Sequence, residues 1–185
     1  MLKKNLFRAI ITALLLTGLL ISCDMGTTAL YNIGDEGPAG GIIFYDKGDN
    51  MGGWRYLEAA PVDISGTKTW GATSIDVPGT LEVIGFGGIN TGKILNAAPT
   101  APAAKACKDY TNKARSDWFL PSVDELRRMR LNLKDTEHWT GFSSSAYWSS
   151  QQNNITDAFA VYFSDGTIHT HTKTTAYRVR PIRAF

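Results

Sequence analysis

The sequence has little net charge. It carries 19 basic and 17 acidic side chains, which gives a formal net charge of +2 at pH 7. Lys3, Lys4 and Arg8 lie in an N-terminal segment that we expect to be removed, so the remainder has one more acidic than basic side chain. Because phosphate binding needs a concentrated basic surface, nucleic acid is excluded as the main partner.

Internal repeats and low-complexity tracts are absent as well. With 19% charged and 43% apolar residues, the chain is neither a disordered polyelectrolyte nor a multi-span membrane protein. Its 185 residues suffice for one domain with a single core and are too few for a comfortable pair. The 18 glycines and the 11% of aromatic residues indicate short strands and many turns.

The N-terminus has the order of a bacterial lipoprotein signal. Lys3 and Lys4 precede an apolar segment, residues 9–21, which is shorter than the roughly 20 residues that a membrane span needs. This segment ends in Leu-Ile-Ser-Cys at residues 20–23, which resembles a lipobox. In a lipobox the cysteine receives a diacylglycerol, and the signal is cut just before it.

We therefore expect a signal peptide over residues 1–22, a lipid on Cys23, a tether over residues 23–32 and a domain over residues 33–185. Two or three acyl chains anchor stably, and a tether of this length reaches at most about 30 Å. The protein would be exported and lipid-anchored to a bacterial membrane, at the cell surface or in the periplasm. A plain secretory signal and a retained anchor helix are the alternatives.

Lipidation of Cys23 would leave Cys107 as a single thiol, so no intramolecular disulfide is expected in the mature protein. Ala103, Cys107 and Tyr110 share one face of an expected helix. We expect a buried core thiol, and the alternative is a catalytic or redox cysteine.

Two helices are expected, the first from about Pro102 to Asn112. The second begins with a capping box, in which Ser122 is the N-cap and Glu125 is at the third helical position. Its apolar residues at helical spacing are Val123, Leu126, Met129 and Leu133, and its outward-facing residues are Arg127, Arg128 and Arg130.

Short strands are expected over much of the remaining chain. They are Ile42–Tyr45, Trp54–Glu58, Ala146–Ser150, Ala158–Phe163, Thr167–Lys173 and Tyr177–Arg183. Alternation along the last four predicts inward-facing side chains at Trp148, Val161, Phe163 and Val179. Residues 61–100, which are rich in glycine and proline, are expected to form loops.

Two motifs resemble chemical sites only in part. Gly87–Lys93 matches half of a phosphate-binding loop, but Ile94 stands where a Ser or Thr should meet Mg²⁺, so we expect a glycine-rich surface loop. His169 and His171 could hold a metal only if Asp165 or His138 folded over them. We therefore expect no metal and no cofactor.

The same histidines belong to the expected ligand surface. His169, His171 and Lys173 would share one face of a strand, and Arg178 could join them from the adjacent strand. Such a cluster would favour an anionic polymer, more so as the pH falls past the histidine reference value of ~6.5. The alternative is that these are solvated edge residues that keep the sheet from pairing with its neighbours.

Four ordered motifs resemble the Lcl C-terminal domain family, which is named for the C-terminal domain of a bacterial collagen-like adhesin and is common in surface lipoproteins. They are Ile33–Tyr45, Asp117–Leu126, Tyr147–Ser150 and Tyr177–Arg183, and the similarity covers roughly residues 31–185. The resemblance implies a compact α+β domain related to the C-type-lectin-like and formylglycine-generating-enzyme-like folds. It also implies attachment to glycans or other surface polymers.

The chain departs from these relatives in three respects. It lacks the collagen stalk of the namesake, the calcium-binding Glu-Pro-Asn and Trp-Asn-Asp motifs of true C-type lectins, and the redox cysteine pair of formylglycine-generating enzymes. Trimerisation through a stalk, calcium-dependent sugar binding and the enzymes' chemistry are therefore not implied.

We expect a non-catalytic binding or adhesion module for glycans or matrix polymers. The alternative is a structural or assembly lipoprotein of the cell envelope with a protein partner. An enzyme is the third hypothesis, with Cys107 or the histidines as its only visible candidates. The sequence leaves the oligomeric state open.

Overall fold

The computed structural model describes residues 30–134 and 141–185, and residues 31–185 form one compact unit. The expected signal peptide, Cys23 and most of the expected tether lie outside the described residues. The strands are β1 (Ile42–Asp46), β2 (Tyr56–Ala59), β3 (Lys68–Thr69), β4 (Ala146–Gln152), β5 (Asp157–Tyr162), β6 (Ile168–Thr172), β7 (Ala176–Tyr177) and β8 (Ile182–Ala184). The helices are α1 (Gly87–Ala97), α2 (Pro102–Asp109) and α3 (Val123–Met129), with a 3-10 turn at Met51–Gly53 and a π-helical turn at Arg130–Lys134.

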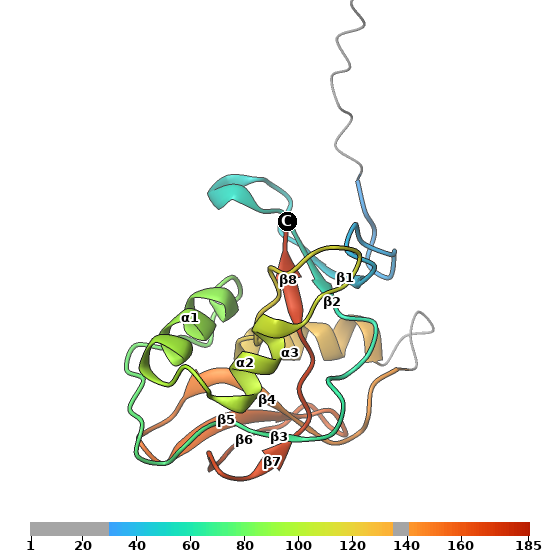
Figure 1. The fold of residues 1–185 in the computed structure, drawn as a ribbon. Coiled ribbons are helices and arrows are strands. Elements are labelled where there is room, and N and C mark those ends of the chain that lie inside the picture. Colours follow the sequence, from blue (N-terminus) through green and yellow to red (C-terminus); the bar gives the residue numbers. More distant parts are fainter. Residues whose placement is uncertain (1–29, 135–140) are drawn as a thin grey trace, which may run out of the picture. The chain divides into compact units, whose positions relative to one another are not determined.

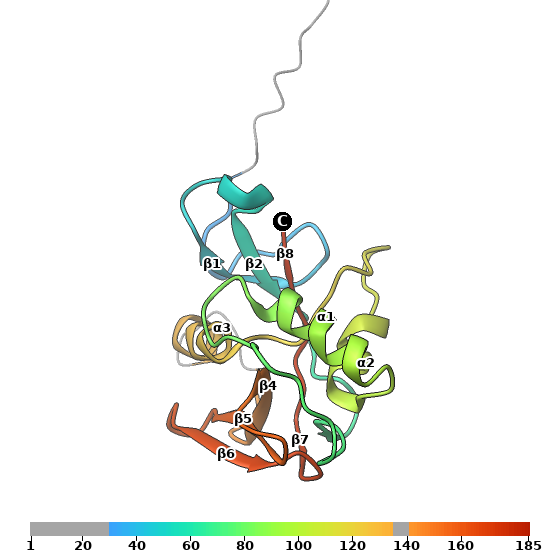
Figure 2. The same cartoon turned by 90° about the vertical axis from the view of Figure 1, so that its left-hand side faces the viewer.

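The strands form antiparallel sheets in the orders β1-β2-β8, β3-β7 and β4-β5-β6 (Figure 1). Figure 2 shows α1 and α2 on one side of the β4-β5-β6 sheet and α3 on the other. The fold is therefore α+β, as expected. No helix among the described residues is long and apolar enough to cross a membrane.

Two expectations about secondary structure are wrong. Helix α1 lies inside the region that was expected to form loops. The sequence does not predict it because its buried face includes the polar residues Asn90 and Thr91 and so has little apolar periodicity. The amide of Asn90 is satisfied by the backbone of Leu81 and by the Ser150 hydroxyl. The expected strand Tyr177–Arg183 is two short strands, β7 and β8, separated by an irregular stretch.

The capping box of α3 is confirmed. Ser122 Oγ accepts the Glu125 N–H at 3.3 Å, and a Glu125 oxygen accepts the Ser122 N–H at 2.7 Å. The apolar residues of this helix are buried as expected, and Arg127 and Arg128 are exposed. Arg130 differs, because it is half-buried and donates to the carbonyls of Phe163 and Ser164.

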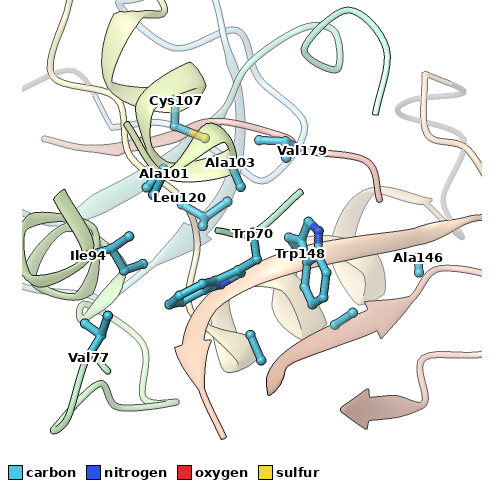
Figure 3. Close-up of a cluster of buried hydrophobic side chains, with 13 residues drawn as sticks. Trp70, Val77, Ile94, Ala101, Ala103, Cys107, Leu120, Ala146, Trp148 and Val179 are labelled. Atoms are coloured by element: carbon cyan, nitrogen blue, oxygen red, sulfur yellow. The ribbon is translucent and has the colours of Figure 1, made fainter. Parts of the chain in front are cut away.

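Strand β4 supplies both main cores. Trp148 faces the cluster beneath α1 and α2, which includes Trp70, Ile94 and Leu120 (Figure 3), whereas Tyr147 faces the cluster beneath α3. The inward positions predicted at Trp148, Val161, Phe163 and Val179 are all completely buried. Cys107 lies in the first cluster, and burial raises the pKa of its thiol well above the usual value, so the expectation of a core thiol is confirmed.

Candidate functional site

The two histidines of the expected ligand surface lie together on β6. Their ring centroids are 6.3 Å apart, and His171 Nε2 is 3.0 Å from the Tyr162 hydroxyl of β5. His169 Nε2 lies 3.0 Å from Thr167 Oγ1. Burial, followed by the charge of His169, lowers the pKa of His171 below the usual value for histidine. Among the described residues no group of three or more His, Cys, Asp or Glu side chains could hold a metal.

Lys173 does not lie on this surface, and the expectation that it joins the histidines is wrong. Its side chain is completely buried, and its ammonium donates to the Ile75 carbonyl at 2.7 Å, to Gln152 Oε1 at 2.7 Å and to the Ile155 carbonyl at 3.1 Å. The Nζ atom also lies 4.8 Å from the centroid of the Trp70 ring. Residue 173 follows the last residue of β6, where the chain turns inward and the segment carrying Ile75 covers it.

Arg178 pairs with Asp63 and was expected to join the histidines. Its guanidinium donates to Asp63 at 3.2 Å, and the same carboxylate accepts from Arg180 at 2.6 Å and from the Tyr147 hydroxyl at 2.9 Å. This network ties the irregular stretch between β7 and β8 to the loop after β2. The role of His169 and His171 in ligand binding stays a prediction.

A second surface carries alternating cations and aromatic rings, and we call it the aromatic–cation row. The centroids of Tyr45 and Trp54 are 6.3 Å apart, Arg128 lies 6.0 Å over the Tyr45 ring, and Lys47 Nζ lies 4.3 Å over the Trp54 ring. Tyr45 and Trp54 are half-buried, and Arg128 is exposed. The row therefore offers ring surface and charged donors together.

A bulge in β1 turns Tyr45 toward this row. Ile43 pairs with Glu58 and Tyr45 pairs with Leu57, so β1 contains one residue more than β2 at this point. Such an extra residue breaks the alternation of faces. Ile43 and Phe44 are accordingly both completely buried, and Tyr45 after them is partly exposed.

The loop before α1 holds Trp54 in place. Gly85 has φ +92°, and a Cβ atom there would lie 3.0 Å from Trp54 Cζ2, so the backbone packs directly on the indole. The Gly85 N–H donates to Glu125 Oε1 at 2.8 Å. The capped helix α3 thus positions both Arg128 and the loop against which Trp54 rests.

A shallow groove of about 440 Å³ adjoins the row at Arg128. Its lining includes Arg127, Arg128 and Arg130, and its acidic residues are Asp124 and Asp165. Asp124 pairs with Arg127 at 3.3 Å. Hydrogen bonds from the backbone N–H and hydroxyl of Thr167 lower the pKa of Asp165. The lining therefore has three basic and two acidic side chains, and both carboxylates already have partners within the domain.

Part of this surface can be predicted from the sequence. The outward direction of Arg127 and Arg128 follows from the capped helix, and the prediction is confirmed. The partly exposed positions of Tyr45 and Trp54 were missed, since the bulge and the packing of Gly85 are not visible in the pattern of apolar residues.

Comparison with protein-family models matches residues 64–183, well over half of the chain, to the Lcl C-terminal domain. Three of the four motifs that carry the resemblance lie within this range, and Ile33–Tyr45 precedes it. The preceding segment nevertheless belongs to the same compact unit, because β1 pairs with β2 and β2 pairs with β8. No curated protein matches the chain.

Proposed function

The chain belongs to the Lcl C-terminal domain family, and on that premise we propose that it is a lipid-anchored bacterial surface protein that binds glycans or matrix polymers without catalysing a reaction. Family membership indicates an adhesin-like binding module. The observation that carries the finer proposal is the aromatic–cation row formed by Lys47, Trp54, Tyr45 and Arg128.

The row has the chemistry that a sugar polymer requires. Aromatic faces stack on the apolar faces of sugar rings, and the polar edges of Tyr and Trp remain available to water and hydroxyl groups. Arginine recognises carboxylate and sulfate groups through paired N–H donors. The arginine-lined groove beside Arg128 extends the donors beyond the two rings, so the surface suits an acidic glycan chain.

If the row binds an acidic glycan, retention on that glycan should depend on both the aromatic rings and the cations of the row. The chain from residue 24 onward, passed over immobilised heparin, should be retained, and Trp54→Ala and Arg128→Ala should each weaken retention several-fold. Added salt should weaken the wild type more than Arg128→Ala, because the variant has lost a screened charge. Lys105→Ala, which removes a positive charge from α2 and its exposed pair with Asp109, is the matched control and should behave as the wild type.

Two results would contradict this site. Equal retention of the wild type, Trp54→Ala and Arg128→Ala would place the contact elsewhere. If His169→Ala/His171→Ala abolished retention while the row variants did not, the surface on β6 would be the binding site.

The anchor is tested separately. Substitution Cys23→Ala should abolish labelling of the expressed protein with radioactive palmitate, since lipid on this cysteine is the proposed attachment to the membrane. Undiminished label in the variant would contradict the lipoprotein proposal and would leave the glycan experiment unaffected.

A further inference from the structure

Three of the four outer strands in the three-stranded sheets are covered by other parts of the chain. The backbone of β1 is bonded by Gly34 and Asp35, that of β8 by Phe119, and that of β4 by Arg178. Each of these contacts satisfies N–H and C=O groups that would otherwise face outward. Strand β6 is the fourth outer strand, and Figure 2 shows it at the free edge of its sheet.

The backbone of β6 exposes one row of hydrogen-bonding groups. Thr167 and Lys173, on either side of the strand, bond the backbones of Tyr162 and Thr156 on the β5 side. Because such bonds recur at every second residue of an antiparallel pair, His169 and His171 also face β5. The N–H and C=O groups of Ile168, Thr170 and Thr172 therefore point away from the sheet.

These outward groups are almost all open. In the described part of the chain, only the Thr172 carbonyl has a backbone partner on the outer side, the Thr175 N–H at 2.8 Å. The side chains of Ile168, Thr170 and Thr172 are exposed, so the edge is accessible.

The edge also lacks the usual features that prevent strands from pairing. Its sequence, Ile-His-Thr-His-Thr, has no lysine, proline or glycine, and its register with β5 is unbroken over all five residues. Natural edge strands are commonly protected by charge, proline or a bulge. Histidine is not a permanently charged side chain, and β6 contains no Lys, Arg, Asp or Glu.

We propose that β6 pairs antiparallel with β6 of a second copy of this chain, with the two-fold axis at Thr170. The two three-stranded sheets would then form one continuous six-stranded sheet. This proposal goes beyond glycan binding. Dimerisation through β6 would give one dimer two copies of the aromatic–cation row.

The strand is complementary to itself in this register. Ile168 faces Thr172 of the second copy and Thr170 faces its own equivalent, so the residues whose backbone groups point outward meet one another. His169 then faces His171 of the second copy at a position without backbone bonds, where side chains approach closely. No permanently charged side chains of like sign are opposed, and the β-branched residues Ile and Thr suit a pleated surface.

Cysteine cross-linking in the full chain on bacterial membranes tests the register. In the proposed pair the two Cα atoms of residue 170 are about 5.5 Å apart, within the range of a disulfide. Thr170→Cys should therefore give a dimer on mild oxidation that reductant reverses. Thr174→Cys, an exposed threonine two residues beyond the strand, is the matched control and should remain monomeric. Equal cross-linking of both variants, or none in either, would overturn the proposal.

A second variant tests the backbone contact. Proline at 170 removes only an N–H that points away from β5, so Thr170→Pro should keep the fold and abolish the dimer seen by sedimentation of the full chain in detergent. If the proline variant fails to fold, Thr170→Asp replaces it as the test. This variant places two carboxylates opposite each other at the two-fold axis and should also abolish the dimer. A wild-type chain that stays monomeric, or a dimer that survives either folded variant, would show that this edge does not join two copies.

Discussion

Two sets of cations in this domain have opposite surroundings. Arg180 is completely buried, and its guanidinium donates to Asp63 at 2.6 Å and to the carbonyls of Ala60 and Gly141 at 2.8 Å each. Lys173 is equally buried and has three oxygen acceptors. Arg128, by contrast, is exposed over the Tyr45 ring. Lys47 lies over the Trp54 ring, and its acceptors are the Met51 carbonyl and the exposed Asp49 carboxylate.

We infer from this comparison that the number of fixed acceptors around a cation distinguishes a structural role from the binding role proposed above. A buried cation whose donors are all used has none left for a ligand, and removing it leaves a buried carboxylate or carbonyl without a partner. A cation on a ring face keeps donors for an incoming sulfate or carboxylate. The variants below test this division, beginning with the largest expected effect.

Arg180→Ala should destabilise the domain most. It leaves the Asp63 carboxylate, which is 12% exposed, with fewer donors, and it leaves the carbonyls of Ala60 and Gly141 without theirs. Loss of one partner from a buried ion pair costs about 3–5 kcal/mol. Urea unfolding of the wild type and variant measures this directly, and a loss below 1 kcal/mol would contradict the structural role.

Glu125 extends the comparison to a buried acid. Burial raises the pKa of Glu125 to about 7, although backbone N–H groups of Ser122 and Gly85 oppose this effect. In the unfolded chain its pKa returns to about 4.5, so between pH 4.5 and 7 the folded state binds more protons than the unfolded state. This group therefore stabilises the fold most below pH 4.5, and its contribution is lost as the pH rises through 7, by roughly 3 kcal/mol.

The Glu125→Gln variant isolates this contribution, because an amide does not titrate. It should be less stable at pH 5, since its NH₂ group meets a backbone donor, but its free energy of unfolding should fall less between pH 5 and 8 than that of the wild type. Parallel pH profiles for the two proteins would rule out a raised pKa at this residue.

Lys173→Met should cost about 2 kcal/mol, because the aliphatic part of the side chain is kept while three oxygen acceptors lose their donor. His169→Ala, which changes an exposed residue of β6, the strand that Lys173 directly follows, should cost less than about 0.5 kcal/mol. Thermal unfolding of both variants measures the difference in stability loss between these two residues, which the sequence analysis expected on one face of a strand. Equal losses would mean that Lys173 is not distinguished by its burial.

Ser122→Ala removes the side-chain oxygen that caps α3 and also donates to the Val83 carbonyl at 3.0 Å. The expected loss is about 1 kcal/mol. Chemical unfolding checks this value, and no loss would show that backbone contacts alone hold the helix start.

Arg128→Ala and Lys47→Ala should have the smallest effect on stability, within about 0.5 kcal/mol, because neither side chain is buried with a full set of acceptors. Their melting temperatures should match the wild type while their retention on heparin falls. A large loss of stability in either variant would move these residues to the structural set.

Local patterns in the sequence predicted the elements that depend on neighbours along the chain. The capping box at Ser122 and Glu125 and the inward positions of β4 and β5 are of this kind, and all are confirmed. The burial of Lys173 depends instead on Ile75, which is 98 residues away in sequence. The direction of Tyr45 depends on a register shift against β2, which changes no local pattern. Helix α1 was missed because a hydrogen-bonded asparagine occupies its buried face.

The indole N–H resonances of the tryptophans give the most direct test of the division between structural and binding surfaces. The indoles of Trp70, Trp118 and Trp148 donate to the carbonyls of Ser149, Arg115 and Lys68 at 2.8, 3.1 and 3.0 Å, and all three rings are buried. Trp54 instead lies half-buried in the aromatic–cation row.

A heparin-derived oligosaccharide should be titrated into ¹⁵N-labelled protein, with each indole assigned by a single Trp→Phe substitution. The Trp54 resonance should show a saturable shift, while those of Trp70, Trp118 and Trp148 should stay in place. Saturable binding that leaves Trp54 unmoved, or that shifts the buried indoles instead, would contradict this prediction.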